Sequence, residues 1–236
     1  MKLKRFAFVA GMLGASAALT VPAAFATNVL SVDGTTSPAA DVAATGALSG
    51  TASMLTDYGY PISCSTVAVS GYVKRGATVA SGMKIGAINN FSVGSGGTSC
   101  TATALNYPLV LQKSTKTASA AEWGIYATAT PSKGAASVPI EIRNMAVKMH
   151  STGSPVWSCD VEAVGTLPGT FNQTTQQIRI TPSAGVFPLS LTAFDGSGTN
   201  TVGSGMSCGG QIYTGDGLQL TGTFTIATPG AGGIHF

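Results

Sequence analysis

Charged residues are scarce in this sequence. Asp, Glu, Lys and Arg make up 9% of its 236 residues, whereas about a quarter is usual for soluble domains. Nucleic-acid binding needs basic groups that neutralise phosphates, and attachment to anionic lipid needs a basic patch. The chain has neither, so its composition excludes both kinds of partner.

Long apolar runs are missing as well, except for a short one at the N-terminus. Three basic residues within the first five positions precede an uncharged, largely apolar run, Phe6–Leu19, and small residues lead to Ala24-Phe25-Ala26. This run is shorter than the about 20 residues of a membrane-spanning helix. The charged head, apolar middle and A-x-A exit predict a secretory signal peptide over residues 1–26, cleaved near Ala26.

Cleavage leaves residues 27–236, which we expect to form a single domain. Three of the 12 basic residues belong to the leader, so the mature chain carries nine Lys and Arg against nine Asp and Glu. No second apolar stretch is long enough to span a membrane. We therefore expect a neutral protein without a transmembrane segment, secreted or held in the cell envelope.

All four cysteines lie in the mature region, at Cys64, Cys100, Cys159 and Cys208. An even number in an exported chain predicts two disulfides, because the compartment outside the cytoplasm is oxidising. Three connectivities are open. A zinc site fails because the cysteines are too widely spaced and the two histidines stand far apart.

Sustained helical stripes of apolar residues are absent after the leader. Short alternating segments rich in Val, Ile, Thr, Tyr and Phe recur instead, separated by Gly, Pro, Asn and Asp, which is the pattern of half-buried strands. The clearest of them are 62–73, 138–149, 177–181 and 218–226. Repeated short strands indicate a sandwich or a barrel, and we predict an all-β domain with a β-sandwich or jelly-roll-like fold.

The alternation also predicts which side chains face the core, because successive side chains of a strand point to opposite faces. In segment 218–226 these are Leu218, Leu220, Gly222, Phe224 and Ile226. In segment 138–149 they are Ile140, Ile142, Val147 and Met149. The small, alanine-rich segment Thr35–Leu48 is predicted as an edge strand or an N-terminal arm.

The two halves of the chain show a weak sequence similarity to each other. Twice, a Met stands ten positions before the Cys of a Ser-Cys pair, and a Val-Gly-Ser-Gly turn then precedes a second Ser-Cys. A duplicated β unit, with halves 43–130 and 131–228, would explain this and would pair Cys64 with Cys100 and Cys159 with Cys208. Chance similarity between Gly- and Ser-rich segments is the alternative, and the sequence leaves both open.

Catalytic patterns are weak. Asp160 and Glu162 would share one strand face, which forms either an acidic site or, more commonly, a solvated face. Glu122 beside Trp123 could be an acid next to a sugar-stacking ring, although packing is the commoner role of a lone Trp. No G-x-S-x-G elbow, nucleotide-binding glycine motif or calcium loop is present. We predict no catalytic, cofactor-binding or metal-binding residue, and therefore no enzyme.

A neutral, disulfide-linked β chain rich in small residues is typical of surface and matrix proteins. Few charges are available to protect strand edges from pairing with another copy. We therefore expect a structural, adhesive or self-assembling role at the cell exterior, with a second copy of the chain, a cell-surface glycan or a hydrophobic surface as partner. The rival interpretation is a carbohydrate- or lipid-binding module whose candidate contacts are Trp123, Trp157, Tyr58, Tyr60 and Tyr107.

Two stretches of the mature chain are similar to those of a known protein family. S-C-S-T-V-A-V-S-G at 63–71 is followed by Gly-rich strands, and the chain closes with C-G-G and then L-T-G-T-F-T-I. Together with the leader, this layout resembles small exported bacterial proteins of the family of alkane oxidation protein activators, over Ala43–Thr228. The resemblance implies an envelope or extracellular protein tied to surfaces or hydrophobic growth substrates, and it carries over no catalytic residue.

Overall fold

The computed structural model describes most of the mature chain. The predicted signal peptide, Tyr107, Trp157 and Cys159 lie outside the described residues. The described ranges are 28–35, 40–93, 100–102, 108–114, 122–132, 134–151, 160–194, 206–208 and 212–236.

The described residues form β-strands, which confirms the predicted all-β class. All pairings between these strands are antiparallel, and no helix in the described ranges could span a membrane. The strands are β1 (Ser31–Val32), β2 (Ala40–Leu48), β3 (Ala52–Thr56), β4 (Pro61–Cys64), β5 (Val67–Arg75), β6 (Lys84–Val93), β7 (Cys100–Ala102), β8 (Pro108–Lys113), β9 (Trp123–Ala127), β10 (Ser137–Ser151), β11 (Asp160–Asn172), β12 (Gln177–Ile180), β13 (Leu189–Ala193), β14 (Met206–Ser207), β15 (Ile212–Tyr213), β16 (Gly217–Ala227) and β17 (Ile234–His235).

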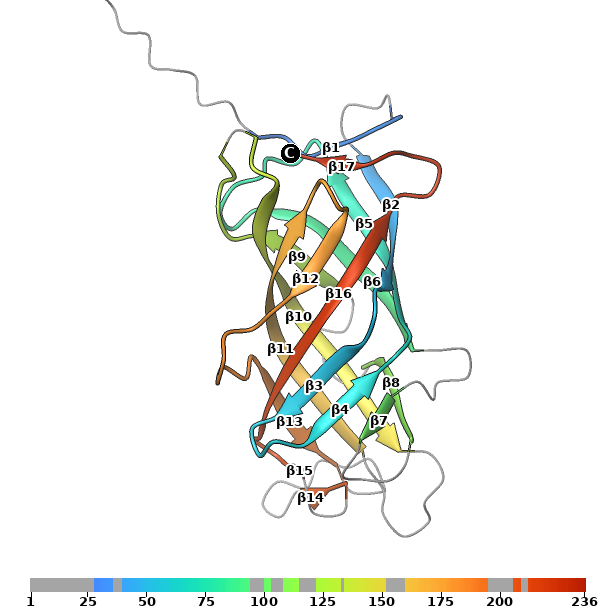
Figure 1. Ribbon diagram of the computed structural model, residues 1–236, viewed down its shortest axis with the longest axis vertical. Coiled ribbons are helices and arrows are strands. Elements are labelled where there is room, and N and C mark those ends of the chain that lie inside the picture. Colours follow the sequence, from blue (N-terminus) through green and yellow to red (C-terminus); the bar gives the residue numbers. More distant parts are fainter. Residues whose placement is uncertain are drawn as a thin grey trace, which may run out of the picture.

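Thirteen of these strands belong to one sheet that closes on itself into an elongated cylinder (Figure 1). The long strands β10, β11 and β16 run through both of its halves. In the upper ring, β16 is followed by β2, β5, β6, β9, β10, β11 and β12, which pairs with β16 again. In the lower ring, β16 is followed by β3, β4, β7, β8, β10, β11 and β13, which also returns to β16.

The closed sheet differs from the β-sandwich or jelly-roll-like fold expected from the strand pattern. A sandwich needs two separate facing sheets, and that architecture is not confirmed. The segment predicted as an edge or arm contains β2, which pairs with β5 on one side and β16 on the other. The edge prediction is therefore wrong for β2 from residue 45 onward, where closure gives the strand two neighbours, whereas residues 40–44 pair only with β5. Both rings draw strands from both predicted halves, 43–130 and 131–228, and the duplication itself stays a prediction.

The interior of the cylinder is the core, and the predicted inward faces point into it. Leu218, Leu220 and Phe224 of β16 are buried. On β10 the inward positions keep a period of two up to Ile142, shift at a β-bulge, and resume at Met145. The extra residue explains why Ile140 and Ile142 before the bulge and Val147 and Met149 after it all face inward, although one pair has even and the other odd numbers. The predicted residues Ile140, Ile142, Val147 and Met149 are all buried.

A disulfide joins Cys64 to Cys100, as the sequence similarity between the two halves of the chain predicts. The two cysteines stand opposite each other in the register of β4 and β7, and both are buried. No cysteine in the described ranges is free. Cys159 lies outside those ranges, so the predicted bridge between Cys159 and Cys208 stays a prediction.

Loss of the Cys64–Cys100 disulfide should lower stability. The bond closes a loop with a sequence separation of 36, so its loss should cost about 3–4 kcal/mol of unfolding free energy in the chain-entropy model. Urea unfolding of the C64A/C100A variant measures the difference. The S63A/T101A variant, which alters the neighbouring cross-strand pair, is the control. An unchanged midpoint for C64A/C100A would contradict the prediction.

Candidate functional site

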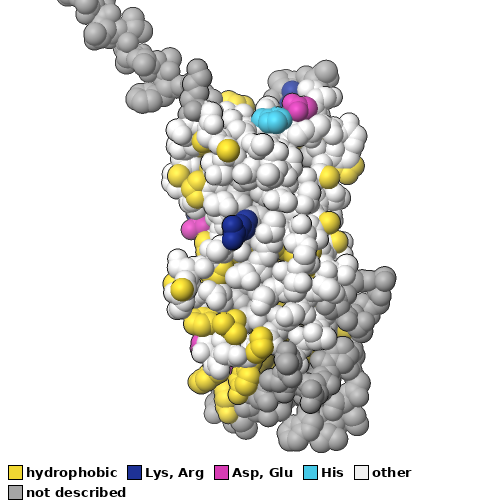
Figure 2. All heavy atoms as spheres, in the orientation of Figure 1, with side chains coloured by type: hydrophobic (Ala, Val, Ile, Leu, Met, Phe, Trp, Pro, Cys, Tyr) yellow, Lys and Arg dark blue, Asp and Glu magenta, His cyan; other side chains and the backbone are white. Residues whose placement is uncertain are grey.

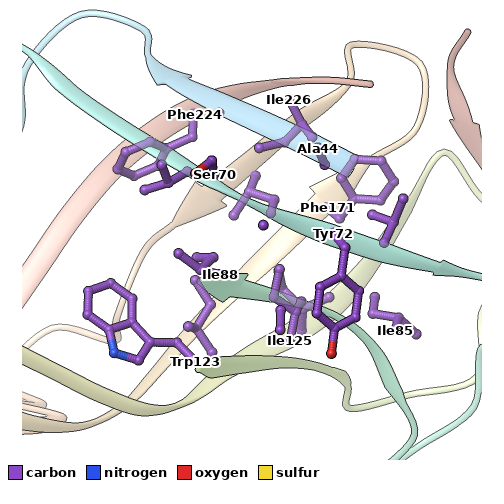
Figure 3. A pocket seen from close by; sticks show the side chains of 18 of the residues that line it. Ala44, Ser70, Tyr72, Ile85, Ile88, Trp123, Ile125, Phe171, Phe224 and Ile226 are labelled. Carbon is purple, nitrogen blue, oxygen red and sulfur yellow. The ribbon is translucent and has the colours of Figure 1, made fainter. Parts of the chain in front are cut away.

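An apolar cavity of about 90 Å³ lies inside the upper ring. Its lining surface is almost entirely apolar and comes from the inward faces of the eight strands of that ring. Figure 3 shows side chains from several of these strands pointing toward a common space. The labelled aliphatic and aromatic residues include Ile85, Ile88, Trp123, Ile125, Phe171, Phe224 and Ile226.

Small residues on two neighbouring strands explain why this space is unfilled. At inward positions, β2 carries Ala44 and Gly46, and β5 carries Gly71, which stands opposite Ala44. The side chains of Val69 and Ile226 lean over Gly46, whose missing Cβ would lie 2.7 Å and 2.9 Å from them. Val69 and Ile226 thus occupy the space beside Gly46, and the wall that adjoins the cavity is formed by the short side chain of Ala44 and by glycine backbone. Interiors are otherwise closely packed with side chains.

Gly71 is required for a second reason, the close approach of β5 and β6. A Cβ at this position would lie 1.9 Å from the carbonyl oxygen of Ala87, which no side chain can accommodate. The register of the two strands shifts at a β-bulge between Ser70 and Gly71. The bulge thus brings two backbones together at the cavity wall.

The two ends of the cavity are closed differently. Phe91, Met145 and Leu220 separate it from a second, much smaller space of about 10 Å³ in the lower ring. Leu30 and Ile234, from segments outside the large sheet, line its upper end, and each is 2% exposed. The cavity is therefore bounded by the packed lower core below and by these two side chains above.

A polar cluster ties the wall together at the bulged strands. The Tyr72 hydroxyl of β5 donates to Glu122 Oε2 at 3.0 Å and accepts from Lys84 Nζ at 3.1 Å, and Tyr72 stands opposite the exposed Ala43. Lys84 of β6 also forms an ion pair with Glu122, which directly precedes β9. One cluster therefore links three neighbouring strands where their backbone ladder is irregular.

The cluster shifts the pKa values of its charged members in opposite directions. The hydrogen bond from Lys84 lowers the pKa of the Glu122 carboxyl most, and the bond from Tyr72 adds to this, while desolvation opposes it. Desolvation alone would lower the pKa of Lys84. The hydrogen bonds to Glu122 and Tyr72 outweigh it and raise that pKa. Both shifts favour the charged pair.

The aromatic contacts predicted from the sequence do not come together among the described residues. Trp123 is 2% exposed and lines the cavity, and its Nε1 has no hydrogen-bond partner in the described structure. Tyr58, 66% exposed, and Tyr60 belong to the turn between β3 and β4 in the lower half. Tyr107 and Trp157 lie outside the described ranges. The described three therefore form no continuous aromatic row.

Asp160 and Glu162 share the outer face of β11, as predicted, but the face is not solvated. Both side chains are buried. Lys148 Nζ lies 3.1 Å from Asp160 Oδ2, and the Ser114 hydroxyl donates to Glu162. Neither acid lines either of the two cavities described above, so these carboxylates act as buried partners of neighbouring side chains.

The remaining polar candidates are scattered. His235 lies near the upper end, with Nε2 2.9 Å from Asp33 Oδ2, and His150 is exposed on β10. The described part of the chain brings no three potential metal ligands together. The sequence predicted several lining residues as core-facing, among them Ile140, Ile142 and Phe224, but it did not predict the cavity itself. The signal for the cavity was the set of small residues in β2 and β5.

Searches with protein-family models, characterised proteins and solved structures give no match.

The Lys84–Glu122 pair should make stability depend on pH. The folded-state pKa of Glu122 lies below its unfolded value, so its stabilisation is present above the unfolded pKa and is lost as pH falls through the folded one. Both side chains are partly exposed, so the effect should stay below about 1 kcal/mol. Unfolding of wild type and E122Q from about pH 7 to pH 3 measures it.

A Lys84→Met background is the control for this pH dependence. The stability difference that E122Q causes should lose most of its pH dependence once the ammonium partner is absent. A difference that is just as pH-dependent in K84M would show that Lys84 is not its cause.

Proposed function

We propose that this protein is a non-catalytic, exported binding protein that takes a small apolar molecule, or a short part of an alkyl chain, into the cylinder. The observation that carries the proposal is the apolar cavity of about 90 Å³ inside the closed upper ring. Closed sheets of eight strands are either filled by their own side chains or hold one small ligand. Here the small residues of β2 and β5 leave room for a ligand.

The character of the lining supports an apolar ligand. Apolar cavities of about 150 Å³ stay dry and take up benzene or xenon, and this cavity is of the same order. Transfer of apolar surface from water stabilises the bound state by about 25 cal/mol per Å². With so few polar groups to orient a ligand, selection would depend on size and shape.

Two observations support action outside the cytoplasm. The first 26 residues have the pattern of a secretory signal peptide. Cys64 and Cys100 are joined by a disulfide, and such bonds persist in oxidising compartments. The resemblance to alkane oxidation protein activators agrees with this, since hydrophobic growth substrates would be a source of apolar ligands.

A structural, self-associating role at the cell surface is the second candidate. The closed sheet gives little support to edge-to-edge pairing, because each of its strands has a neighbour on both sides along at least part of its length. Exposed apolar side chains favour self-association through a surface patch instead. Figure 2 shows hydrophobic side chains gathered in the lower part of the molecule, and Tyr58, Val186 and Tyr213 are 66%, 48% and 43% exposed. Self-association would use such a patch.

Binding of benzene to the oxidised mature protein tests the proposal. We expect saturable shifts of isoleucine methyl signals in NMR spectra, centred on cavity residues such as Ile125 and Ile226. Ala44→Leu should fill the void and weaken binding at least about tenfold, since a buried side chain then occupies the site. Its urea midpoint checks that it folds.

Ala43→Leu is the matched control. Ala43 precedes Ala44 on the same strand but is exposed on the outer face, so A43L should bind benzene like the wild type. Absence of saturable shifts in the wild-type protein would contradict the proposal. Equal binding by folded A44L and A43L would place the ligand elsewhere.

A further inference from the structure

Two short strands outside the large sheet cover the upper end of the cavity. Leu30, next to β1, and Ile234, on β17, both line the cavity. β1 and β17 form a separate two-stranded sheet in which Val32 stands opposite Ile234. This pair, which we call the terminal ribbon, lies across the upper end of the cylinder (Figure 1).

The two halves of the terminal ribbon are attached to the cylinder in different ways. Backbone bonds hold the segment before β1. The Leu30 amide donates to the Ala77 carbonyl at 2.9 Å, and the Gly76 amide donates to the Leu30 carbonyl at 2.8 Å. Side chains hold β17. Gln176 Oε1 accepts from the Ile234 amide at 2.8 Å, and Gln176 Nε2 donates to the Ile234 carbonyl at 3.0 Å.

One side chain thus satisfies both backbone groups of the residue that closes the cavity. Gln176 belongs to the turn between β11 and β12, so it connects the ribbon to the rim of the large sheet. Gln173, from the same turn, accepts one further hydrogen bond from the Phe236 amide at 3.0 Å. The attachment of β17 to this turn therefore depends on two glutamine side chains.

Gln176 makes these contacts from a strained backbone. Its φ is 54°, in the left-handed region that glycine adopts freely and asparagine tolerates, but that is unfavourable for most residues with a Cβ. Glycine would relieve the strain and lose the amide group. Strain that persists because the surroundings require a particular side chain is characteristic of ligand clamps and switch regions.

We infer that the terminal ribbon is a lid over the apolar cavity and that Gln176 is the latch that holds its C-terminal strand. The inference rests on the proposed function, because a lid has a role only if the cavity takes a ligand. An isolated two-stranded ribbon has little stability of its own, and binding lids come from the least stable parts of a fold. Release of β17 withdraws Ile234 and opens the cavity without breaking a pairing of the large sheet.

Benzene exchange in latch variants tests the inference. Q176N tolerates the same φ, but its shorter side chain cannot span both bonds to Ile234, and Q176G removes the side chain altogether. We expect benzene to enter and leave about tenfold faster in both variants, since two hydrogen bonds that hold the lid are lost. NMR line shapes of the isoleucine methyl groups give the rates. The dissociation constant should change far less than the rates.

Asn144→Gly is the matched control. Asn144 has a similar φ of 59°, is exposed, and lies at the bulge of β10. N144G relieves the same kind of strain without touching the ribbon, so its exchange rates should equal those of the wild type. Benzene that binds all variants with unchanged rates would overturn the lid while leaving the proposed function intact.

Hydrogen exchange keeps the latch testable even if benzene does not bind, an outcome that would overturn the proposed function instead. The Ile234 amide should exchange about tenfold faster in Q176N than in the wild type. Amides of β16 should be unaffected. An Ile234 amide that is equally protected in both proteins would show that Gln176 does not hold the ribbon.

Discussion

The closure of the sheet by β16 is the constraint on which the rest of the structure depends. In its upper half β16 lies between β2 and β12, and in its lower half between β3 and β13. Without these pairings the sheet would have open edges with unpaired backbone groups, and its apolar face would be open to water. With them, the apolar faces of all strands point into one enclosed interior. The disulfide, the cavity and the terminal ribbon are all positioned on this closed sheet.

The same closure produces a filled interior in one half and an unfilled one in the other. Long side chains such as Met54, Leu111 and Leu189 fill the lower ring, where the remaining space is about 10 Å³. The upper ring has a cavity of about 90 Å³ because small residues of β2 and β5 meet on adjacent strands. Residue size on two strands thus decides where the protein can hold a ligand, and the terminal ribbon covers the upper end of that place.

Local pattern predicted much of this fold, because alternation fixes the inward face of a strand without any knowledge of its partners. The all-β class and the inward faces of segments 138–149 and 218–226 follow from such patterns. The Cys64–Cys100 pair was one of three open connectivities and was favoured only by the similarity between the two halves of the chain. Closure could not be predicted in this way, because it depends on which distant strands pair. The alanine-rich segment around Ala44 looked like an edge because small side chains say little about burial.

The cavity could not be predicted from the sequence either, because it also depends on which distant strands pair. The cavity arises where Ala44 stands opposite Gly71, two residues far apart in the sequence and inconspicuous alone. Trp123 was named as a candidate ligand contact, with packing as its commoner role, and it is buried in the cavity wall, so packing describes it. The latch was not visible either, since a glutamine in a polar turn shows no sign of its backbone strain.

A crystal structure of the oxidised mature protein under xenon pressure would show whether the upper ring holds an accessible apolar cavity, because xenon occupies such cavities without needing polar contacts. We expect xenon density inside the upper ring, beside the β2–β5 wall and against Val69 and Ile226, with no comparable site in the lower ring. An upper ring that is filled by side chains, or that holds ordered water and no xenon, would contradict this expectation.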